Sequence, residues 1–202
     1  MNKYTVSYCP AVPDWSKIPV LNIDTPYRKT PDDIRAYAQI GWDEQAFHVH
    51  LWADVQELRA VEEGPYGMPC EDSCLEFFFC PVPGDPRYMN IEFNPNGCMY
   101  LGMGTSLKDL TRLIPDQEGN PFQPRIQKTG SGWEVFYTVP YRFIRRFFPN
   151  FAPIPGMTIR ANCYTCSDLS DKPYYLSWNQ VEAQPFTFHH SQSFGFMILS
   201  SL

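Results

Sequence analysis

Two runs of residues in the middle of the chain constrain the fold most. Residues 72–80 (DSCLEFFFC) are apolar nearly throughout, and residues 88–94 (YMNIEFN) alternate apolar with polar side chains. Alternation with a period of two is typical of a strand with one buried face. The two runs therefore predict neighbouring strands joined by a turn segment. Their core-facing positions are Leu75, Phe77, Phe79, Met89, Ile91 and Phe93.

The opposite face of this pair carries polar groups. Glu76 is a single carboxylate in an apolar run, and Asn90, Glu92 and Asn94 share one face of the second run. A buried carboxylate needs partners, so a charge here indicates either a rim residue with its head in water or a functional group. Both interpretations of Glu76 stay open from the sequence.

The rest of the chain predicts more short strands and one helix. Residues 35–42 and 46–54 predict a hairpin, and residues 98–104, 126–129, 133–139, 156–164, 174–178 and 194–199 predict further strands. Residues 141–148 have apolar side chains at helical spacing. Residues 107–120 predict a polar excursion. Residues 1–33, with several prolines and a strand candidate at residues 4–7, predict an irregular lead-in.

About ten short strands with one small helix predict an all-β fold. We expect an antiparallel β-sandwich of jelly-roll or immunoglobulin-like type. A length of 202 residues is enough for one domain with its own core, and no boundary divides the chain, so we expect a single domain over 1–202.

Charge and hydropathy limit the partners. The net charge is -6 and no basic cluster occurs, which argues against nucleic acid as a partner. No run of 18 apolar residues predicts a membrane span, and the first residues lack the apolar run of a secretory signal. We therefore expect a cytoplasmic protein with neutral or cationic partners.

The cysteines and histidines raise the question of a metal. Seven cysteines, an odd number scattered through strand-like runs, predict reduced and buried thiols rather than a disulfide framework. Cys163 and Cys166 form a single Cys-x-x-Cys motif, which is a weak metal or redox signal. His48, His50 and Trp52 share one strand face, and this spacing is also common in solvated sheets. We expect no metal ligand among them and no required cofactor.

Several motifs in order resemble a known family. They are residues 40–54 (IGWDEQAFHVHLWAD), 72–79 (DSCLEFFF), 88–97 (YMNIEFNPNG), 132–140 (GWEVFYTVP), 156–164 (GMTIRANCY), Trp178 and residues 188–195 (FHHSQSFG). This order resembles the family 9 carbohydrate-binding modules and their DOMON-like relatives. The resemblance implies a β-sandwich that binds sugars without cleaving them, typically a terminal glucose or cellobiose unit, sometimes with structural calcium.

The resemblance also implies site residues. Trp178 matches the tryptophan of the family's late loop, Glu76 its strand carboxylate, and Glu92 or Asn94 the polar positions of the next strand. Asn162 adds a further amide. Where the family has a second stacking aromatic, this chain has residues 68–70 (MPC), and only Tyr66 is nearby.

These residues predict non-catalytic binding of a glucose-type sugar, with Trp178 stacking on the ring and Glu76 bonding its hydroxyls. For any calcium, Asp54 and Asp72 near strand ends are the oxygen donors that the sequence suggests.

Three alternatives remain open. Trp178 could plug the mouth of the sandwich instead of facing a ligand. Glu76 and Glu92 could be the paired carboxylates of a glycoside hydrolase, if they lie ~5 Å apart for retention or ~6.5–9.5 Å for inversion. A protein-interaction or redox-sensing module would use the exposed aromatics or the thiols instead.

Overall fold

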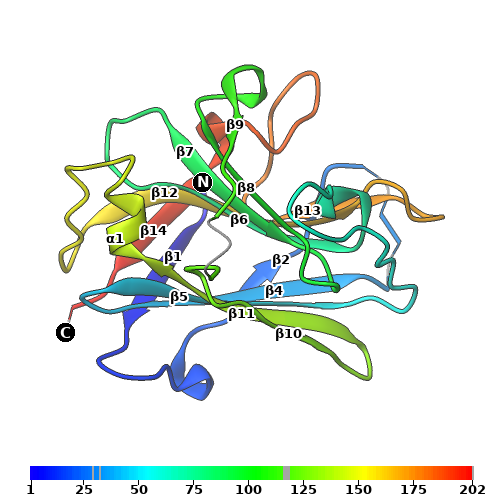
Figure 1. Cartoon of the computed structure of the whole chain (residues 1–202), viewed down its shortest axis with the longest axis horizontal. Helices are drawn as coiled ribbons and strands as arrows, with labels where there is room; N and C mark the ends of the chain where they lie inside the picture. Colours follow the sequence, from blue (N-terminus) through cyan, green and yellow to red (C-terminus); the bar gives the residue numbers. More distant parts are fainter. Residues whose placement is uncertain (29, 32, 116–118, 202) are drawn as a thin grey trace.

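The computed structural model describes residues 1–28, 30–31, 33–115 and 119–201. Two layers of strands face each other across a core (Figure 1). Residues 116–118 of the predicted polar excursion lie outside the described residues. Within the described part of the chain, no helix is long and apolar enough to cross a membrane.

One layer, named here the upper layer from its place in Figure 1, contains the apolar run 72–80 and the alternating run 88–94. Its hydrogen-bonded order is β14 (Gly195–Leu199), β12 (Thr158–Ser167), β6 (Cys74–Cys80), β7 (Tyr88–Phe93), β8 (Met99–Gly104) and β9 (Thr111–Arg112). β13 (Tyr174–Ser177) pairs with β12 and with β3 (Thr25–Pro26). All these pairs are antiparallel.

The lower layer contains the predicted hairpin. Its order is β10 (Arg125–Lys128), β11 (Gly132–Pro140), β5 (Ala46–Asp54), β4 (Arg35–Trp42) and β2 (Leu21–Ile23), with all pairs antiparallel. β4 and β5 have the boundaries that the alternation predicted. Apolar residues alternate strongly in both strands, which is why the sequence predicts the boundaries of both.

β1 (Lys3–Tyr8) joins the two layers. Residues 3–6 pair with β14 of the upper layer and residues 7–8 pair with β4 of the lower layer, both in parallel. The antiparallel prediction is therefore wrong for β1, and the sheet is mixed. The predicted lead-in also contains β2 and β3, so it is less irregular than its prolines indicated. The all-β prediction holds, while the jelly-roll or immunoglobulin-like topology stays a prediction.

The predicted helix is shorter than expected. α1 spans Tyr141–Ile144, and turns continue to residue 147. Pro149 follows, and a proline disfavours the helical conformation of the residue before it, so helical structure cannot continue past Phe148. The other helical pieces are single 3₁₀ turns: η1 (Trp15–Lys17), η2 (Pro69–Glu71), η3 (Leu107–Asp109) and η4 (Ser191–Ser193).

The alternation of the central strands divides their side chains between two apolar clusters. Leu75, Phe77 and Phe79 enter the main core between the layers, as do the odd residues of β7. Cys74, Phe78 and Cys80 point the other way, into a second cluster on the outer face of the upper layer. The segment 179–190 covers this second cluster, so β6 is buried on both faces. Its nearly continuous apolar run follows from that double burial.

Candidate functional site

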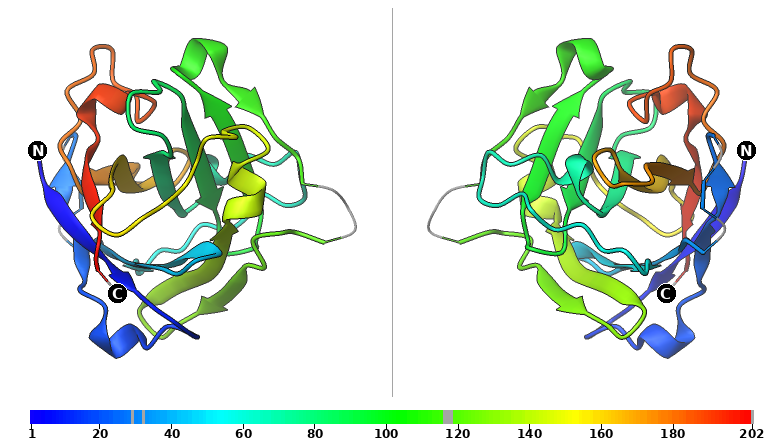
Figure 2. Two further views of the ribbon diagram at one scale, coloured as in Figure 1. Left: turned by 90° about the vertical axis from the view of Figure 1, so that its left-hand side faces the viewer. Right: turned by 90° about the vertical axis from the view of Figure 1, so that its right-hand side faces the viewer.

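A cavity of about 480 Å³ lies on the outer face of the upper layer. The chain around η3 and the segment 179–190, green and orange in Figure 1, rise from this layer on either side. Figure 2 shows the same two projections from both ends of the molecule. The lining residues are Tyr27, Arg28, Met68, Cys70, Glu76, Glu92, Tyr100, Leu107, Leu110, Cys166, Asp168, Tyr175, Phe186, Thr187, Phe188 and His189.

The floor of the cavity contains the two carboxylates that the sequence singled out. Glu76 of β6 lies directly opposite Glu92 of β7 in the strand register. Directly opposite residues of an antiparallel pair have Cβ atoms about 4.5–5.5 Å apart. Only 2% of Glu76 and 4% of Glu92 is exposed. Glu76 is therefore not a solvated rim residue.

Burial controls the protonation of this pair. Loss of solvent raises the pKa of Glu76 well above its ordinary value, and the charge of Glu92 raises it further. Burial also raises the pKa of Glu92, to about 7, while a hydrogen bond from Asn90 and the charge of Arg112 oppose the shift. At neutral pH the floor thus offers a neutral carboxyl as a hydrogen-bond donor beside a partly ionised acceptor.

Asn90 holds Glu92 in place. Its Nδ2 donates to Oε1 of Glu92 at 2.8 Å, and both side chains are buried. Gly102 of β8 lies opposite Asn90, and a Cβ added to this glycine would lie 2.3 Å from Oδ1 of Asn90. Glycine at position 102 therefore leaves the space that the Asn90 side chain occupies.

Aromatic side chains line one side of the cavity. The rings of Tyr27 and Phe186 stack with centroids 3.5 Å apart, and Tyr175 meets the edge of Phe186 at 5.5 Å. The guanidinium of Arg28 lies over the Tyr175 ring at 4.5 Å. Tyr27 is 38% exposed, so this group combines apolar ring surface with access to solvent.

Tyr100 of β8 lines the other side. It lies opposite Glu92 in the register, and Arg112 lies over its ring at 4.5 Å. Tyr175 and Tyr100 come from β13 and β8, which are separated by β12, β6 and β7. Four strand spacings place the two backbones about 19 Å apart, so the carboxylate floor lies between two aromatic sides.

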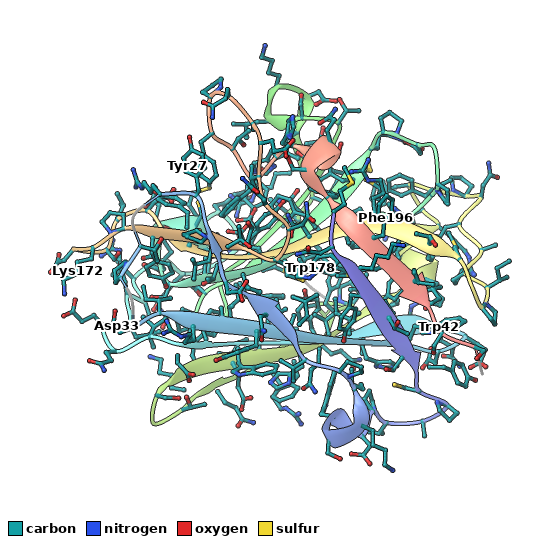
Figure 3. The ribbon with its side chains drawn as sticks, turned by 180° about the vertical axis from the view of Figure 1, so that it is seen from behind. Tyr27, Asp33, Trp42, Lys172, Trp178 and Phe196 are labelled. Atoms are coloured by element: carbon teal, nitrogen blue, oxygen red, sulfur yellow. The ribbon has the colours of Figure 1, made fainter. Side chains whose placement is uncertain are left out.

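Trp178, the predicted stacking residue, lies elsewhere. It is 6% exposed, belongs to the main core and meets the ring of Tyr4 edge-on at 6.4 Å. Figure 3 shows Trp178 between the two layers and Tyr27 above them. The stacking role needs an accessible ring face, so the prediction for Trp178 is wrong, and the alternative of an internal plug fits its position.

Three other predicted residues also lie outside the cavity lining. Asn162 is buried and bonds the backbone of Asn179, donating to its oxygen at 2.9 Å and accepting from its nitrogen at 2.9 Å. Asn94 is buried and donates to Asp72 at 2.8 Å. Tyr66 is 75% exposed. Of the six predicted residues, Glu76 and Glu92 line the cavity together.

The suggested metal donors are mostly engaged with protein groups. His48 contacts Asp43 and His50 contacts Glu134, each at 2.8 Å. Cys163 points into the main core and Cys166 into the second cluster, so the Cys-x-x-Cys motif does not converge.

The two suggested calcium donors, Asp54 and Asp72, differ in burial. Asp72 is fully buried and accepts backbone hydrogen bonds from Val61 and Glu62, while Asp54 accepts one from the Ser131 hydroxyl. These partners hold the loop before β6 and the β10–β11 hairpin. Calcium binding stays a prediction.

The aromatic residues of the cavity were missed for identifiable reasons. Tyr175 could have been found, because it alternates with Tyr174 and Leu176, which face the core. The same period places Trp178 on the core side. Tyr27 and Phe186 come from irregular segments with no period, so no sequence signal places them together.

Comparisons with known proteins agree with this architecture. A solved structure of a putative carbohydrate-binding protein from Bacteroides uniformis is 24% identical, with a TM-score of 0.81 over 98% of this chain and 99% of that chain. A family 9 carbohydrate-binding module from Caldicellulosiruptor kristjanssonii, solved in complex with glucose, is 15% identical. Its TM-score is 0.69 over 100% of this chain and 97% of that chain. A structure of a family 9 module from the same organism in complex with cellotriose is also 15% identical, with a TM-score of 0.70 over 100% of this chain and 95% of that chain.

At these identities the structural matches establish the fold alone. A comparison with curated proteins finds no match. The resemblance to DOMON-like proteins stays a prediction. The model of carbohydrate-binding family 9, however, matches residues 9–199, which is nearly the whole chain. The chain therefore belongs to carbohydrate-binding family 9.

Proposed function

We propose that the chain binds carbohydrate without cleaving it, in the cavity above Glu76 and Glu92. The observation that carries the proposal is the combination of a buried carboxylate pair with aromatic rings on either side. Pyranose rings present apolar C–H faces and polar hydroxyls, and this cavity offers surfaces for both. Its volume is also in the usual range for small-ligand sites, ~300–1,000 Å³.

A glucose-type residue at the end of a mono- or oligosaccharide is the ligand we propose. Two structures of the same fold were solved in complex with glucose and with cellotriose. In this chain Tyr175, rather than Trp178, is proposed to stack on the sugar. Glu76 donates to one hydroxyl and Glu92 accepts from another, since the two carboxyls differ in protonation.

A glycoside hydrolase is the less favoured alternative. The register places the Cβ atoms of Glu76 and Glu92 about 4.5–5.5 Å apart, which is compatible with the ~5 Å carboxyl separation of retaining enzymes. Both carboxyls, however, rise side by side from one floor, while hydrolysis needs them to flank the scissile bond. The different protonation of the two carboxyls would also serve a hydrolase, so their placement, and not their charge, is what disfavours cleavage.

Calorimetric titration of the chain with soluble glucose, cellobiose and cellotriose tests the proposal. Binding of at least one of them, with no change in the sugar after prolonged incubation, is the expected result. Chromatography of the incubated sugars provides the check on cleavage. Release of shorter sugars would favour the hydrolase, and absence of heat and of thermal stabilisation with all three would contradict the glucose-type ligand.

A further inference from the structure

Two cysteines beside the cavity floor are not used by the proposed sugar site, and they lie next to Glu76, which is. Cys74 and Cys166 lie directly opposite each other on β6 and β12. Their sulfur atoms and a carboxylate oxygen of Glu76 all lie within 4.8 Å of one another, and all three residues are buried. Sγ of Cys166 and Oε1 of Glu76 are 3.1 Å apart.

This spacing fits a metal ion. A tetrahedral ion with Zn–S bonds of about 2.3 Å holds two sulfur ligands about 3.8 Å apart and a carboxylate oxygen at a similar distance. The group therefore needs only small side-chain movements to close on an ion. Because two of the three donors are sulfur, a soft or borderline cation suits it better than calcium, which takes oxygen ligands.

The surroundings of the group supply further negative charge and access for a cation. Glu92 and Asp168 add negative charge near Glu76, and the described ion pairs include none to Glu76 or Glu92. Cys166 and Glu76 both line the cavity, so an ion has a path from solvent. A bound dication would favour the ionised form of Glu76, which burial otherwise disfavours.

We propose that Cys74, Glu76 and Cys166 form a binding site for Zn²⁺ or a similar thiophilic dication, with the remaining coordination position toward the cavity. Binding displaces the thiol protons, and those protons are released to solvent. This site does not rest on the sugar-binding proposal, because its ligands can be tested with the metal alone.

Titration of the fully reduced protein with Co²⁺ is the test, because thiolate ligands give Co²⁺ an intense near-ultraviolet charge-transfer absorption. We expect saturation at one Co²⁺ per chain and loss of the absorption when Zn²⁺ displaces it. Cys166→Ser and Cys74→Ser should each weaken binding more than about tenfold, since even partners beyond the ligands contribute ~10–100-fold. Glu76→Gln should weaken binding but keep the thiolate absorption.

Cys80→Ser is the matched control. Cys80 lies on the same strand and the same face as Cys74, six residues away, or about 20 Å along the strand. Circular dichroism shows whether each variant is folded. If a serine variant is unfolded, the affinity of Glu76→Gln for Co²⁺ tests the site instead. The proposal is overturned by absence of the charge-transfer absorption in the reduced parent. Equal loss in Cys80→Ser, or unchanged affinity in a folded Cys166→Ser or Cys74→Ser, also overturns it.

Discussion

At the scale of single residues, strand parity decides which side chains can meet a ligand. Glu76 was placed correctly because its neighbours Leu75 and Phe77 are plainly core residues. Trp178 was misplaced because it ends a strand, where its accessibility was argued from the loop that follows. Residues two positions apart in a strand share a face, and Leu176, two positions before Trp178, faces the core. Period-two alternation is therefore stronger evidence than proximity to a loop.

Trp178→Ala should reduce stability rather than affinity. The ring fills space in the main core, and removal of a buried aromatic costs about 3–5 kcal/mol. Urea unfolding monitored by circular dichroism measures the loss. Trp52→Ala, at a half-buried position on the outer face of the lower layer, should cost less. An unchanged unfolding midpoint for Trp178→Ala, or a weaker sugar affinity in its folded fraction, would contradict the core role.

Glu92→Gln should make stability less dependent on pH. Glutamine keeps an oxygen that can accept from Asn90 but has no charge to bury. In the folded protein the pKa of Glu92 is about 7, against an ordinary value of 4.5. The protonated Glu92 therefore makes its full contribution to the free energy of unfolding below pH 4.5. That contribution is lost as the pH rises through 7.

The variant should therefore gain roughly 2–3 kcal/mol over the parent at pH 8 and very little at pH 4.5. Urea titrations at the two pH values give the comparison. The quantity to compare is the difference in unfolding free energy between the variant and the parent at each pH. Burial lowers the pKa of His189 to about 4, so His189 makes both proteins less stable as the pH falls below neutrality, and this effect cancels in the difference. An equal difference at both pH values would exclude the proposed titration.

At the scale of elements, segments without regular structure complete the site on a regular floor. Tyr27 precedes β4, and Phe186 belongs to the segment 179–190 that joins β13 to η4. The sequence predicts the floor because strands have a period. The two aromatic residues meet through the tertiary structure, 159 positions apart, and no local pattern records that contact.

Asn162 links the floor to this covering segment. Its two hydrogen bonds to Asn179 fix the point where the segment leaves the upper layer. Asn162→Ala leaves the Asn179 backbone groups without this buried partner, which costs about 1–3 kcal/mol. Sugar affinity should also fall, since Phe186 loses its fixed position. The control Asn22→Ala, on the exposed side of β2, should change neither quantity.

Calorimetry and urea unfolding on both variants distinguish this role from direct contact. Reduced stability together with reduced affinity is the expected pattern for Asn162→Ala. Reduced affinity at full stability would indicate instead that Asn162 touches the sugar, as the sequence first suggested.

At the scale of the whole molecule, β1 couples the two layers. Its first four residues extend the upper layer and its last two extend the lower one. The sequence marked residues 4–7 as a strand candidate, but parallel pairing with β14, nearly 200 positions away, leaves no local signal. This non-local pairing is also why the antiparallel prediction failed at this strand.

Ser7→Pro should weaken the joint between the layers. Ser7 lies opposite Gly41 where β1 pairs with β4, and proline removes its backbone N–H from that ladder. We expect a loss of about 1–3 kcal/mol in urea unfolding, against less than about 0.5 kcal/mol for Ser7→Ala. Equal stability of the two variants would show that β1 adds little to the assembly.

The central claim is that the outer face of the upper layer binds the sugar. Tyr175 and Tyr37 allow a matched comparison, because both are half-buried tyrosines on outward sheet faces, one in each layer, and both contact another aromatic ring. Each variant loses a similar amount of aromatic surface. Any difference in sugar affinity therefore reports the location of the site.

Calorimetric titration of the best sugar into the parent, Tyr175→Ala and Tyr37→Ala tests the claim most directly. Stacking on an aromatic ring contributes about 1–3 kcal/mol by analogy with bases, so Tyr175→Ala should bind roughly 10- to 100-fold more weakly. Tyr37→Ala should bind as the parent does. Unchanged affinity in a folded Tyr175→Ala, with loss in Tyr37→Ala, would contradict the claim and place the site on the face that carries His48, His50 and Trp52.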